Sequence, residues 1–413
     1  MRQAELLLRG AVVVSAEAAR PLDLAIRGGR IAWLGEPGTG PTCGEVMDLS
    51  GLTLLPGLID GHVHFREPGG HAHKGTYLSE SRAAAAGGVT SVLTMPNTVP
   101  FCGTREVLAA VRAAAAGRCH VDYGLHFGVT ADNLPELIAV DNVPAFKIYM
   151  NETTGISSPL CDEALLARLL ALGHPVAAHA EGETLDFLLA MHRRYGTGPL
   201  YVVHVALAHE VAALRAAKAA GQWVYGEVTP HHLFLDQRDA ARLGPFGDMR
   251  PTLKKPSDVA ALWEALADGT LDTIATDHAP HLRSEKAAAS PPPGVAGLQT
   301  MLPLLLDAVA AGRLSLRQVV RLTSRNPALI FGLRDKGELR VGAAADLVAV
   351  DPHVRETIRD TDQLTQPGWT PFDGRTVVGR VELTWLRGQL IYRSGEVLGE
   401  PQGREIPTRS PGG

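Results

Sequence analysis

The chain has 413 residues, of which 45% are hydrophobic and 20% charged, with a formal net charge of −5. That length is too great for one small domain and suits a (β/α)8 barrel of ~250 residues with a second unit beside it. The weak negative charge argues against nucleic acid or an anionic membrane as a partner. The four cysteines form no C-x-x-C pair, so they indicate neither a disulfide framework nor a thiolate metal site. Because no signal segment or membrane-length apolar run is visible, we expect a cytoplasmic protein.

The first fifty residues predict short β-strands. Apolar runs cover residues 6–8, 12–14, 24–26 and 31–34, and glycines separate them. Short apolar runs with glycine turns are typical of a β-sandwich or a meander.

From about residue 57, strand-like runs alternate with helical stretches rich in Ala and Leu. Residues 89–95 precede a predicted helix at 105–116, and residues 176–178 precede one at 182–194. This alternation predicts βα units on a parallel sheet. Because roughly six to eight units fit into residues 57–335, we expect a closed (β/α)8 barrel rather than an open doubly wound sheet.

Strand-like runs return after about residue 340. We therefore expect residues 1–56 and 336–413 to form one small β-sandwich domain from both chain ends. The polar stretch 357–379 predicts a long surface loop. The stretch 287–294 (AAASPPPG) predicts a turn-rich loop over the active face of the barrel.

The sharpest histidine cluster is the run GHVHFR, which follows an apolar run at 54–60 that predicts one buried strand. On a strand, alternate side chains share a face, so His62, His64 and Arg66 would point into the barrel mouth. Two imidazoles at this spacing can bind one metal ion. Two strand-end histidines without a metal remain the alternative for this motif by itself.

Other candidate ligands also stand at the ends of apolar runs. His179, His204 and Asp277 each follow one. The carboxyl ends of barrel strands converge on one face, where active sites form. Each residue alone could be a hydrogen-bonded histidine or a helix-capping aspartate, but together with the histidine cluster they predict a metal site.

Lys147 lies inside the apolar run AFKIY. Burial lowers the pKa of a lysine, and the neutral amine can react with carbon dioxide. The resulting carbamate has one negative charge and two oxygens, so it can bridge two zinc ions. The alternative is a lysine that pairs with a carboxylate; the neighbouring candidate ligands favour the carbamate.

These motifs resemble the amidohydrolase superfamily and, within it, the dihydroorotases. The matching stretches include LPGLIDGHVHFREPG at 55–69, MPNT at 95–98, EVTPHHL at 227–233 and DHAPH at 277–281. The resemblance runs, with gaps, from about residue 50 to 395. It is greatest to the dihydroorotase domain of the animal multifunctional pyrimidine-synthesis protein, a branch that has a lysine where many bacterial dihydroorotases have an aspartate.

The resemblance implies two zinc ions per subunit, held by His62, His64, Lys147, His179, His204 and Asp277. Carboxylated Lys147 would bridge the two ions. Three residues would bind the substrate carboxylate, with Gly297 beside them: Arg66, Asn97 and His281. Thr153 and Thr154 would belong to a lid loop. This lid lacks the aromatic residue of the animal domain, and the stretch 71–74 is one residue longer.

The implied reaction is the reversible closure of N-carbamoyl-L-aspartate to L-dihydroorotate, a step of pyrimidine biosynthesis, by a zinc-activated hydroxide. Asp277 would be the catalytic acid and base that passes a proton to the leaving ring nitrogen. Glu227, His231 and Arg250 would support the ligands or the lid, and structural hydrogen bonding is the alternative for Glu227 and His231.

Three questions of function and assembly stay open at this point. A related cyclic amidase, an allantoinase or a dihydropyrimidinase (hydantoinase), would share the metal ligands. A second alternative is an inactive homologue that acts as a scaffold for aspartate transcarbamoylase. We expect a small-molecule substrate and a homo-oligomer, and association of the active enzyme with aspartate transcarbamoylase stays open.

Overall fold

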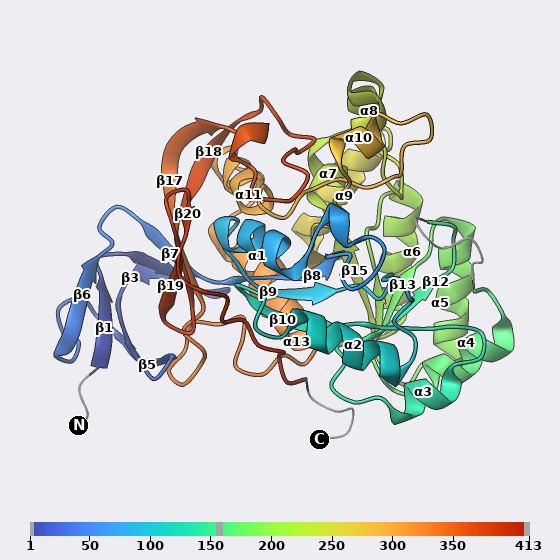
Figure 1. Cartoon of the computed structure of the whole chain (residues 1–413), viewed down its shortest axis with the longest axis horizontal. Helices are drawn as coiled ribbons and strands as arrows, with labels where there is room; N and C mark the ends of the chain where they lie inside the picture. Colours follow the sequence, from blue (N-terminus) through green and yellow to red (C-terminus); the bar gives the residue numbers. More distant parts are fainter. Residues whose placement is uncertain (1–3, 154–159, 409–413) are drawn as a thin grey trace.

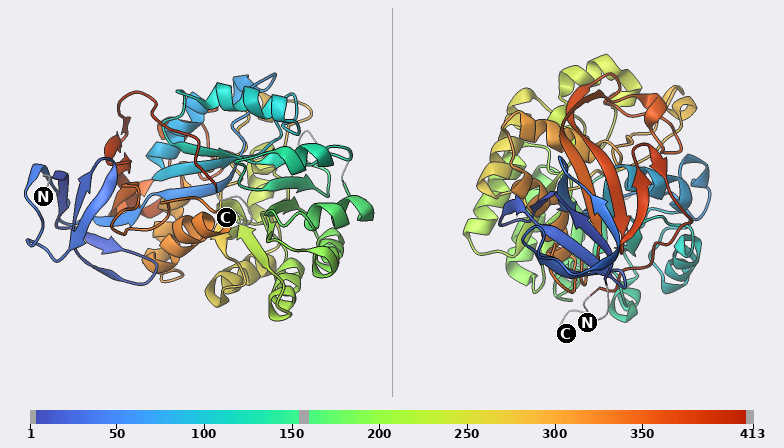
Figure 2. Two further views of the ribbon diagram at one scale, coloured as in Figure 1. Left: turned by 90° about the horizontal axis from the view of Figure 1, so that it is seen from below. Right: turned by 90° about the vertical axis from the view of Figure 1, so that its left-hand side faces the viewer.

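The computed structural model describes residues 4–153 and 160–408, and its strands gather into two regions (Figure 1). The region at one end of the molecule holds strands from both chain ends. The other holds parallel strands with helices around them (Figure 2). No helix within the described ranges is long and apolar enough to cross a bilayer.

The strands from the chain ends form two sheets. The first consists of β1 (Ala4–Arg9), β4 (Asp23–Arg27), β5 (Arg30–Gly35) and β6 (Cys43–Asp48), in the order β5-β4-β1-β6. The second consists of β2 (Val12–Val14), β3 (Ala19–Pro21), β7 (Thr53–Pro56), β17 (Leu347–Thr357), β18 (Thr376–Leu386), β19 (Gln389–Arg393) and β20 (Glu396–Val397). Its order is β20-β19-β18-β17-β7-β2-β3.

The second sheet joins the two chain ends directly. Strand β17 pairs antiparallel with β7, with Leu347 opposite Pro56. Leu24, Leu54 and Trp385 lie in one buried apolar cluster that both sheets share. The two ends therefore share a sheet and a core, while the exact boundaries 1–56 and 336–413 stay a prediction.

The parallel strands form a three-stranded and a six-stranded sheet. The first consists of β8 (Leu58–Val63), β9 (Val89–Thr94) and β10 (Asp122–Leu125), in the order β10-β9-β8. The second consists of β11 (Phe127–Gly128), β12 (Phe146–Tyr149), β13 (Val176–His179), β14 (Leu200–Val202), β15 (Val224–Val228) and β16 (Thr273–Ile274). These six pair in chain order.

The two parallel sheets approach each other at both edges. Only His126 separates β10 from β11 along the chain. At the other edge, Val63 forms an isolated parallel bridge with His278, and the backbone N–H of His64 donates to the His278 carbonyl at 2.8 Å. The predicted α/β class is confirmed. The hydrogen-bonded strands nevertheless form two sheets rather than one ring, so the closed barrel stays a prediction.

Helices alternate with the parallel strands, as the sequence predicts. They are α1 (Tyr77–Ala86), α2 (Arg105–Ala115), α3 (Leu134–Ala139), α4 (Glu163–Leu170), α5 (Glu183–Tyr195), α6 (Ala208–Ala219), α7 (Pro230–Phe234), α8 (Gln237–Leu243), α9 (Pro256–Asp268), α10 (Arg283–Lys286), α11 (Met301–Ala310), α12 (Leu316–Val320) and α13 (Asn326–Ile330). Three short 3-10 helices are η1 (Ala72–Lys74), η2 (Gly244–Gly247) and η4 (Asp360–Asp362), and η3 (Arg321–Arg325) is a π-helical turn between α12 and α13.

Helix α2 illustrates the local rules behind these elements. The Thr104 side chain caps it by accepting from the Val107 N–H at 3.2 Å. Leu108, Val111 and Ala115 are buried, at the three- and four-residue spacing of one helix face.

The apolar run at 54–60 is two strands, not one as predicted. It breaks at Gly57, where the chain leaves the sheet of β7 and enters that of β8. A Cβ atom at Gly57 would lie 2.3 Å from Thr90 Oγ1, so only glycine fits this crossing. Both halves are apolar because both are buried, and hydropathy therefore does not reveal the break.

The stretch 357–379 is not the surface loop that its polarity predicts. Its last residues belong to β18, and Trp369 and Phe372 are buried in an apolar cluster with Leu304. Trp369 Nε1 also donates to the carbonyl of His281 at 2.7 Å. Two buried aromatic side chains thus hold this mostly polar segment against the rest of the protein.

Candidate active site

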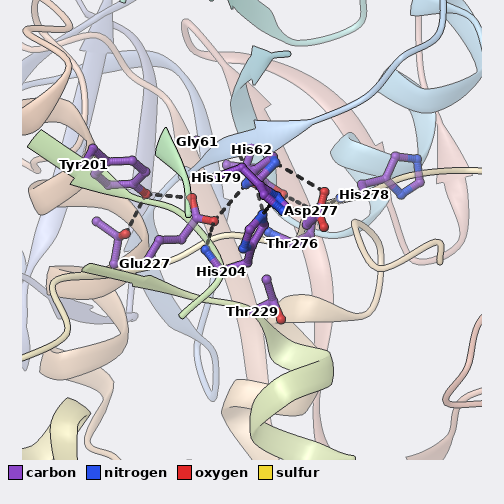
Figure 3. Close-up of polar contacts among 12 residues, drawn as sticks. Gly61, His62, His179, Tyr201, His204, Glu227, Thr229, Thr276, Asp277 and His278 are labelled. Atoms are coloured by element: carbon purple, nitrogen blue, oxygen red, sulfur yellow. Dashed lines mark hydrogen bonds and ion pairs between the residues drawn. The ribbon is translucent and has the colours of Figure 1, made fainter. Parts of the chain in front are cut away.

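The predicted metal ligands and Arg66 line one cavity at the carboxyl ends of the parallel strands. His62 lies in β8, Lys147 in β12, and His179 is the last residue of β13. The described residues that line the cavity are His62, His64, Arg66, Asn97, Lys147, Tyr149, Thr153, His179, His204, Arg250, Asp277, Ala279, Pro293 and Gly294. Strands that are far apart in sequence therefore deliver the candidate ligands to one place (Figure 3).

His62, His64 and Asp277 form a compact group. Asp277 Oδ1 lies 3.2 Å from His62 Nε2 and 2.9 Å from His64 Nε2. Burial lowers the pKa of both histidines. Burial works to raise the pKa of Asp277, but the two histidines hold it below its usual range. Neutral imidazoles beside a carboxylate have the protonation states that metal ligands need.

Hydrogen-bond acceptors lie behind the two histidines. Glu227 Oε1 lies 2.8 Å from His62 Nδ1, and Asn97 Oδ1 lies 2.5 Å from His64 Nδ1. With its proton on Nδ1, each ring donates to the acceptor behind it and keeps a lone pair on Nε2. Both lone pairs face Asp277, the side on which a metal would sit.

Glu227 is itself held by three donors. Its Oε2 accepts from the Tyr201 hydroxyl at 2.8 Å, and its Oε1 accepts from His62 and from the backbone N–H of His204 at 3.0 Å (Figure 3). Burial raises the pKa of Glu227 to about 7. Glu227 thus lies behind His62 and orients its ring.

The second half of the cavity holds His179, His204 and Lys147. His179 Nδ1 and His204 Nε2 face each other at 2.8 Å. Lys147 Nζ is buried, and among the described residues it has no hydrogen-bond partner. Burial lowers the pKa of Lys147 to about 8. A buried amine without a partner is unusual in a folded protein and requires an explanation.

A separate positive group lies beside these residues. Arg66 is buried, and its Nη2 lies 3.3 Å from His281 Nε2. Burial lowers the pKa of Arg66 to about 10, so the guanidinium remains charged at neutral pH. A buried cation that lines a cavity is suited to bind an anionic group.

Comparison with known families identifies this arrangement. Residues 53–391 match the Amidohydrolase family. The chain belongs to this family. The resemblance inferred from the histidine, lysine and aspartate motifs is therefore confirmed.

Within the amidohydrolases, the chain is similar to proteins named dihydroorotase. It is 38% identical to the one from Halobacterium salinarum over 382 residues, which cover 86% of this chain and 89% of that relative. It is 34% identical to the one from Anoxybacillus flavithermus, over 90% of this chain and 95% of that relative. It is also 41% identical to the multifunctional protein CAD of Squalus acanthias over 360 residues, but these span only 15% of that protein.

Solved structures of hydantoinases have the same fold as this amidohydrolase. The L-hydantoinase (dihydropyrimidinase) from Arthrobacter aurescens superposes with a TM-score of 0.93 at 26% identity, covering 98% of this chain and 100% of that one. The dihydropyrimidinase from Brevibacillus agri NCHU1002 has a TM-score of 0.90 at 28% identity, over 97% and 98% of the two chains.

Three residues at this amidohydrolase site have left-handed backbones although none is glycine. Their φ angles are 64° for Arg66, 40° for His204 and 45° for Asp277. Such conformations cost about 1–3 kcal/mol each and cluster at functional sites. The strand β8 ends at Val63, so the left-handed turn rather than strand alternation places Arg66 in the cavity.

The structure places only some of the other predicted site residues in the cavity. Thr153 and Arg250 line the cavity. His231 and His281 lie outside the lining. The His231 ring packs at a tilt against that of His232, with 4.5 Å between the ring centres. The Gly297 N–H donates to His278 Nδ1 at 3.3 Å, next to Asp277. Thr154 lies outside the described residues.

Sequence reasoning missed two tyrosines of the site. Tyr149 lines the cavity two positions after Lys147 on the same strand, so strand alternation could have found it. Tyr201 donates to Glu227 from a different strand, and no local pattern links the two residues.

Proposed function

We propose that this amidohydrolase is a dihydroorotase, which reversibly cyclises N-carbamoyl-L-aspartate to L-dihydroorotate in pyrimidine biosynthesis. The relatives named dihydroorotase, at 34% and 38% identity over most of both chains, support this reaction. The observation that carries the proposal is the buried Arg66–His281 pair beside His62, His64 and Asp277. The Arg66 guanidinium would bind a substrate carboxylate, and the three neighbouring side chains could hold a metal ion.

The residues present fit two zinc ions bridged by a carboxylated lysine. The ligand atoms of His62, His64 and Asp277 lie within 4.8 Å of one another, as ligands of one ion do. His179 and His204 would hold the second ion. The buried Lys147 Nζ, with no hydrogen-bond partner in the described part of the chain, would carry the bridging carbamate.

When bound, zinc supplies Lewis acidity toward an amide carbonyl and makes water acidic enough to act as a nucleophile near neutral pH. Asp277 would accept the proton of the attacking water and return it to the leaving ring nitrogen. Arg66, Asn97 and His281 would orient the substrate carboxylate and thereby the amide carbon. The turn-rich stretch that contains Pro293 and Gly294 lines the cavity and would limit the access of bulk water.

A hydantoinase activity is the second candidate, because the structural neighbours at TM-scores of 0.93 and 0.90 are hydantoinases. A hydantoin ring has no obligatory carboxylate, so this activity leaves the buried Arg66 without a role. An allantoinase shares the same difficulty. An inactive scaffold for aspartate transcarbamoylase would have no need for the complete set of candidate ligands around the cavity.

The proposal also covers the fold closure, the domain boundaries, the cellular location and the assembly of the protein. We infer that the parallel strands close into a (β/α)8 barrel at residues 57–335, with residues 1–56 and 336–413 as the β-sandwich domain. The cytoplasmic location and the homo-oligomer are likewise proposed. The similarity to CAD supports testing whether the enzyme associates with aspartate transcarbamoylase.

Turnover of L-dihydroorotate, hydantoin and allantoin by the zinc-loaded protein tests the proposed function. We expect dihydroorotate to be the preferred substrate. In Arg66→Ala both zinc ions should remain, while kcat/KM for dihydroorotate should fall by at least roughly a hundredfold, because a buried bidentate charge partner is lost.

The control is Arg105→Ala, which removes an exposed arginine that pairs with Glu136. It should keep the wild-type rate. Preference of the wild type for hydantoin, or near-normal turnover of dihydroorotate by Arg66→Ala, would refute the assignment.

A further inference from the structure

A buried carboxylate lies behind Asp277, outside the cavity. Glu80 of α1 is fully buried, and its Oε2 lies 2.7 Å from Nε2 of His278, the residue that follows Asp277. Its carboxylate accepts from three more donors, which are the hydroxyls of Ser79 and Thr365 and the backbone N–H of Gln366. Glu80 thus joins α1, the turn after Asp277 and the segment between η4 and β18.

The contacts of the His278 ring agree with a single protonation state. The Gly297 N–H donates to Nδ1 at 3.3 Å, and a backbone N–H can only donate. Nδ1 therefore carries no proton, so the ring is neutral with its proton on Nε2. That proton faces Glu80 Oε2, which accepts it. Each ring nitrogen thus has its own partner, and the two contacts require the same tautomer.

The backbone of His278 is bonded to one candidate ligand and follows another. Its carbonyl accepts from the His64 N–H at 2.8 Å, and its own N–H donates to Thr276 Oγ1 at 3.1 Å. Asp277 precedes it by one peptide bond, and Asp277 Oδ1 lies 2.9 Å from His64 Nε2 (Figure 3). Fixing the position of His278 therefore fixes the spacing of these two ligand side chains.

Asp277 needs support on both sides because its backbone is left-handed, with a φ angle of 45°. A non-glycine residue keeps this conformation only where its surroundings hold it. Before Asp277, Thr276 is held by Asp60, whose carboxylate accepts from the Thr276 N–H at 3.1 Å and from its hydroxyl at 2.6 Å. After Asp277, His278 is held by Glu80. A buried carboxylate thus holds each neighbour of Asp277.

We propose that Glu80 is a positioning residue: through the His278 ring it fixes the peptide that joins Asp277 to the His64 backbone, and so it holds these two ligands at the spacing that binds zinc. This inference rests on the proposed function, in which Asp277 is a zinc ligand and the catalytic acid and base. Glutamine cannot replace Glu80, because its amide has one acceptor oxygen, whereas His278 and the Gln366 N–H need an acceptor on each side.

Thr365 provides a matched control. Its buried hydroxyl donates to Oε2, the same Glu80 oxygen that accepts from His278. Thr365→Val keeps a branched side chain and removes only this contact, so Glu80 still accepts from His278. Effects of a weaker attachment of the segment before β18 therefore appear in both variants, whereas effects on the ligands appear only in Glu80→Gln.

Zinc affinity and kinetics of Glu80→Gln and Thr365→Val test the proposal. In Glu80→Gln the Kd of zinc, measured by competition with a chromophoric chelator, should rise roughly tenfold, the low end for outer partners of metal ligands, because Glu80 acts through one further residue. At saturating zinc, kcat for dihydroorotate should fall, while KM should stay within about threefold of wild type because the Arg66 contacts are kept. Thr365→Val should match the wild type in all three quantities.

Two further measurements keep the test decisive if Glu80→Gln fails to fold. His278→Asn keeps an acceptor for the Gly297 N–H but is too short to reach Glu80, so it should show the same loss of zinc affinity. Neutron diffraction from crystals of the wild-type holoenzyme should show a proton on Nε2 of His278, directed at Glu80, and none on Nδ1.

An unchanged zinc Kd in folded Glu80→Gln, an equal rise in Thr365→Val, or a proton on Nδ1 of His278 would overturn the proposal. Such a failure is distinct from failure of the proposed function. If the wild type binds zinc but does not turn over dihydroorotate, the proposed reaction is wrong, while the zinc Kd values still test Glu80. If the wild type is active and Glu80→Gln keeps its zinc Kd, the reaction stands and the role of Glu80 falls.

Discussion

Lys147 is the side chain whose chemistry depends most on its surroundings. It is fully buried, it has no hydrogen-bond partner among the described residues, and burial lowers its pKa to about 8. A lysine with that pKa is partly neutral at physiological pH and so is nucleophilic toward carbon dioxide. Burial penalises the charged ammonium form of Lys147. A carbamate at the same position would instead offer two oxygens to the zinc ions that the neighbouring ligands would hold.

Replacing Lys147 with Ala should remove at least one of the two zinc ions and lower kcat/KM by more than about a hundredfold, because losing only an outer partner of a metal ligand already costs about 10–100-fold. Metal analysis and turnover of dihydroorotate measure both effects. Lys218→Ala is the control, because that lysine pairs with Asp272 away from the cavity. Full metal content and full activity in Lys147→Ala would exclude the bridging carbamate.

At the scale of elements, His126 joins the two parallel sheets. It stands between β10 and β11, and its backbone N–H donates to the Thr94 carbonyl at 3.0 Å. Its Nε2 donates to the Gly61 carbonyl at 3.1 Å, directly before His62. The ring also packs edge-on against Phe331, with 5.4 Å between the ring centres. A neutral imidazole is therefore part of the support for β8.

This contact should make stability depend on pH. Burial lowers the pKa of His126 from 6.5 to about 4, so between these values the unfolded chain binds the proton and the folded chain does not. The stabilising contribution is complete above pH 6.5 and is lost as the pH falls toward 4. Between pH 7.5 and 5 the loss should be about 2 kcal/mol.

Urea unfolding at both pH values measures the effect. His126→Gln keeps a donor for Gly61 but cannot titrate, so its free energy of unfolding should fall less than that of the wild type over this interval. His353→Gln, which changes an exposed histidine, should follow the wild type. Equal pH dependence of wild type and His126→Gln would show that His126 does not titrate on unfolding.

At the scale of the whole molecule, a buried ionic network joins the terminal sheets to the parallel strands. The Lys336 ammonium contacts Asp122, the first residue of β10, and Asp346, which precedes β17. Arg387 also pairs with Asp122. The side chains of Lys336 and both aspartates are at most 7% exposed, so little solvent screens them. The C-terminal segment adds backbone pairing between Tyr123 and residues 404–406.

Replacing Lys336 with Met should lower the free energy of unfolding by about 3–5 kcal/mol, because it leaves two buried carboxylates without their shared cation. Chemical denaturation measures the change. Arg325→Met removes the exposed pairs with Glu17 and Glu338 and should cost only about 0–1 kcal/mol. A loss below about 1 kcal/mol in Lys336→Met would mean that the network does not join the two regions energetically.

The sequence by itself determined the α/β class, the strands at both chain ends and the family. Residue hydrophobicity and its periodicity are local properties of the sequence, and they are visible in runs such as 176–178 followed by 182–194. The candidate ligands other than Lys147 could also be found, because each stands where an apolar run ends, and the carboxyl ends of parallel strands meet at one edge.

Only the tertiary structure decided how these pieces meet. The break at Gly57, the left-handed turn at Arg66 and the burial of Trp369 depend on what packs against each residue from elsewhere in the chain. The Tyr201–Glu227 and Lys74–His281 contacts join residues 26 and 207 positions apart. A hydrogen bond between distant segments leaves no periodic trace in either of them, so the partners are known only once the strands are in place.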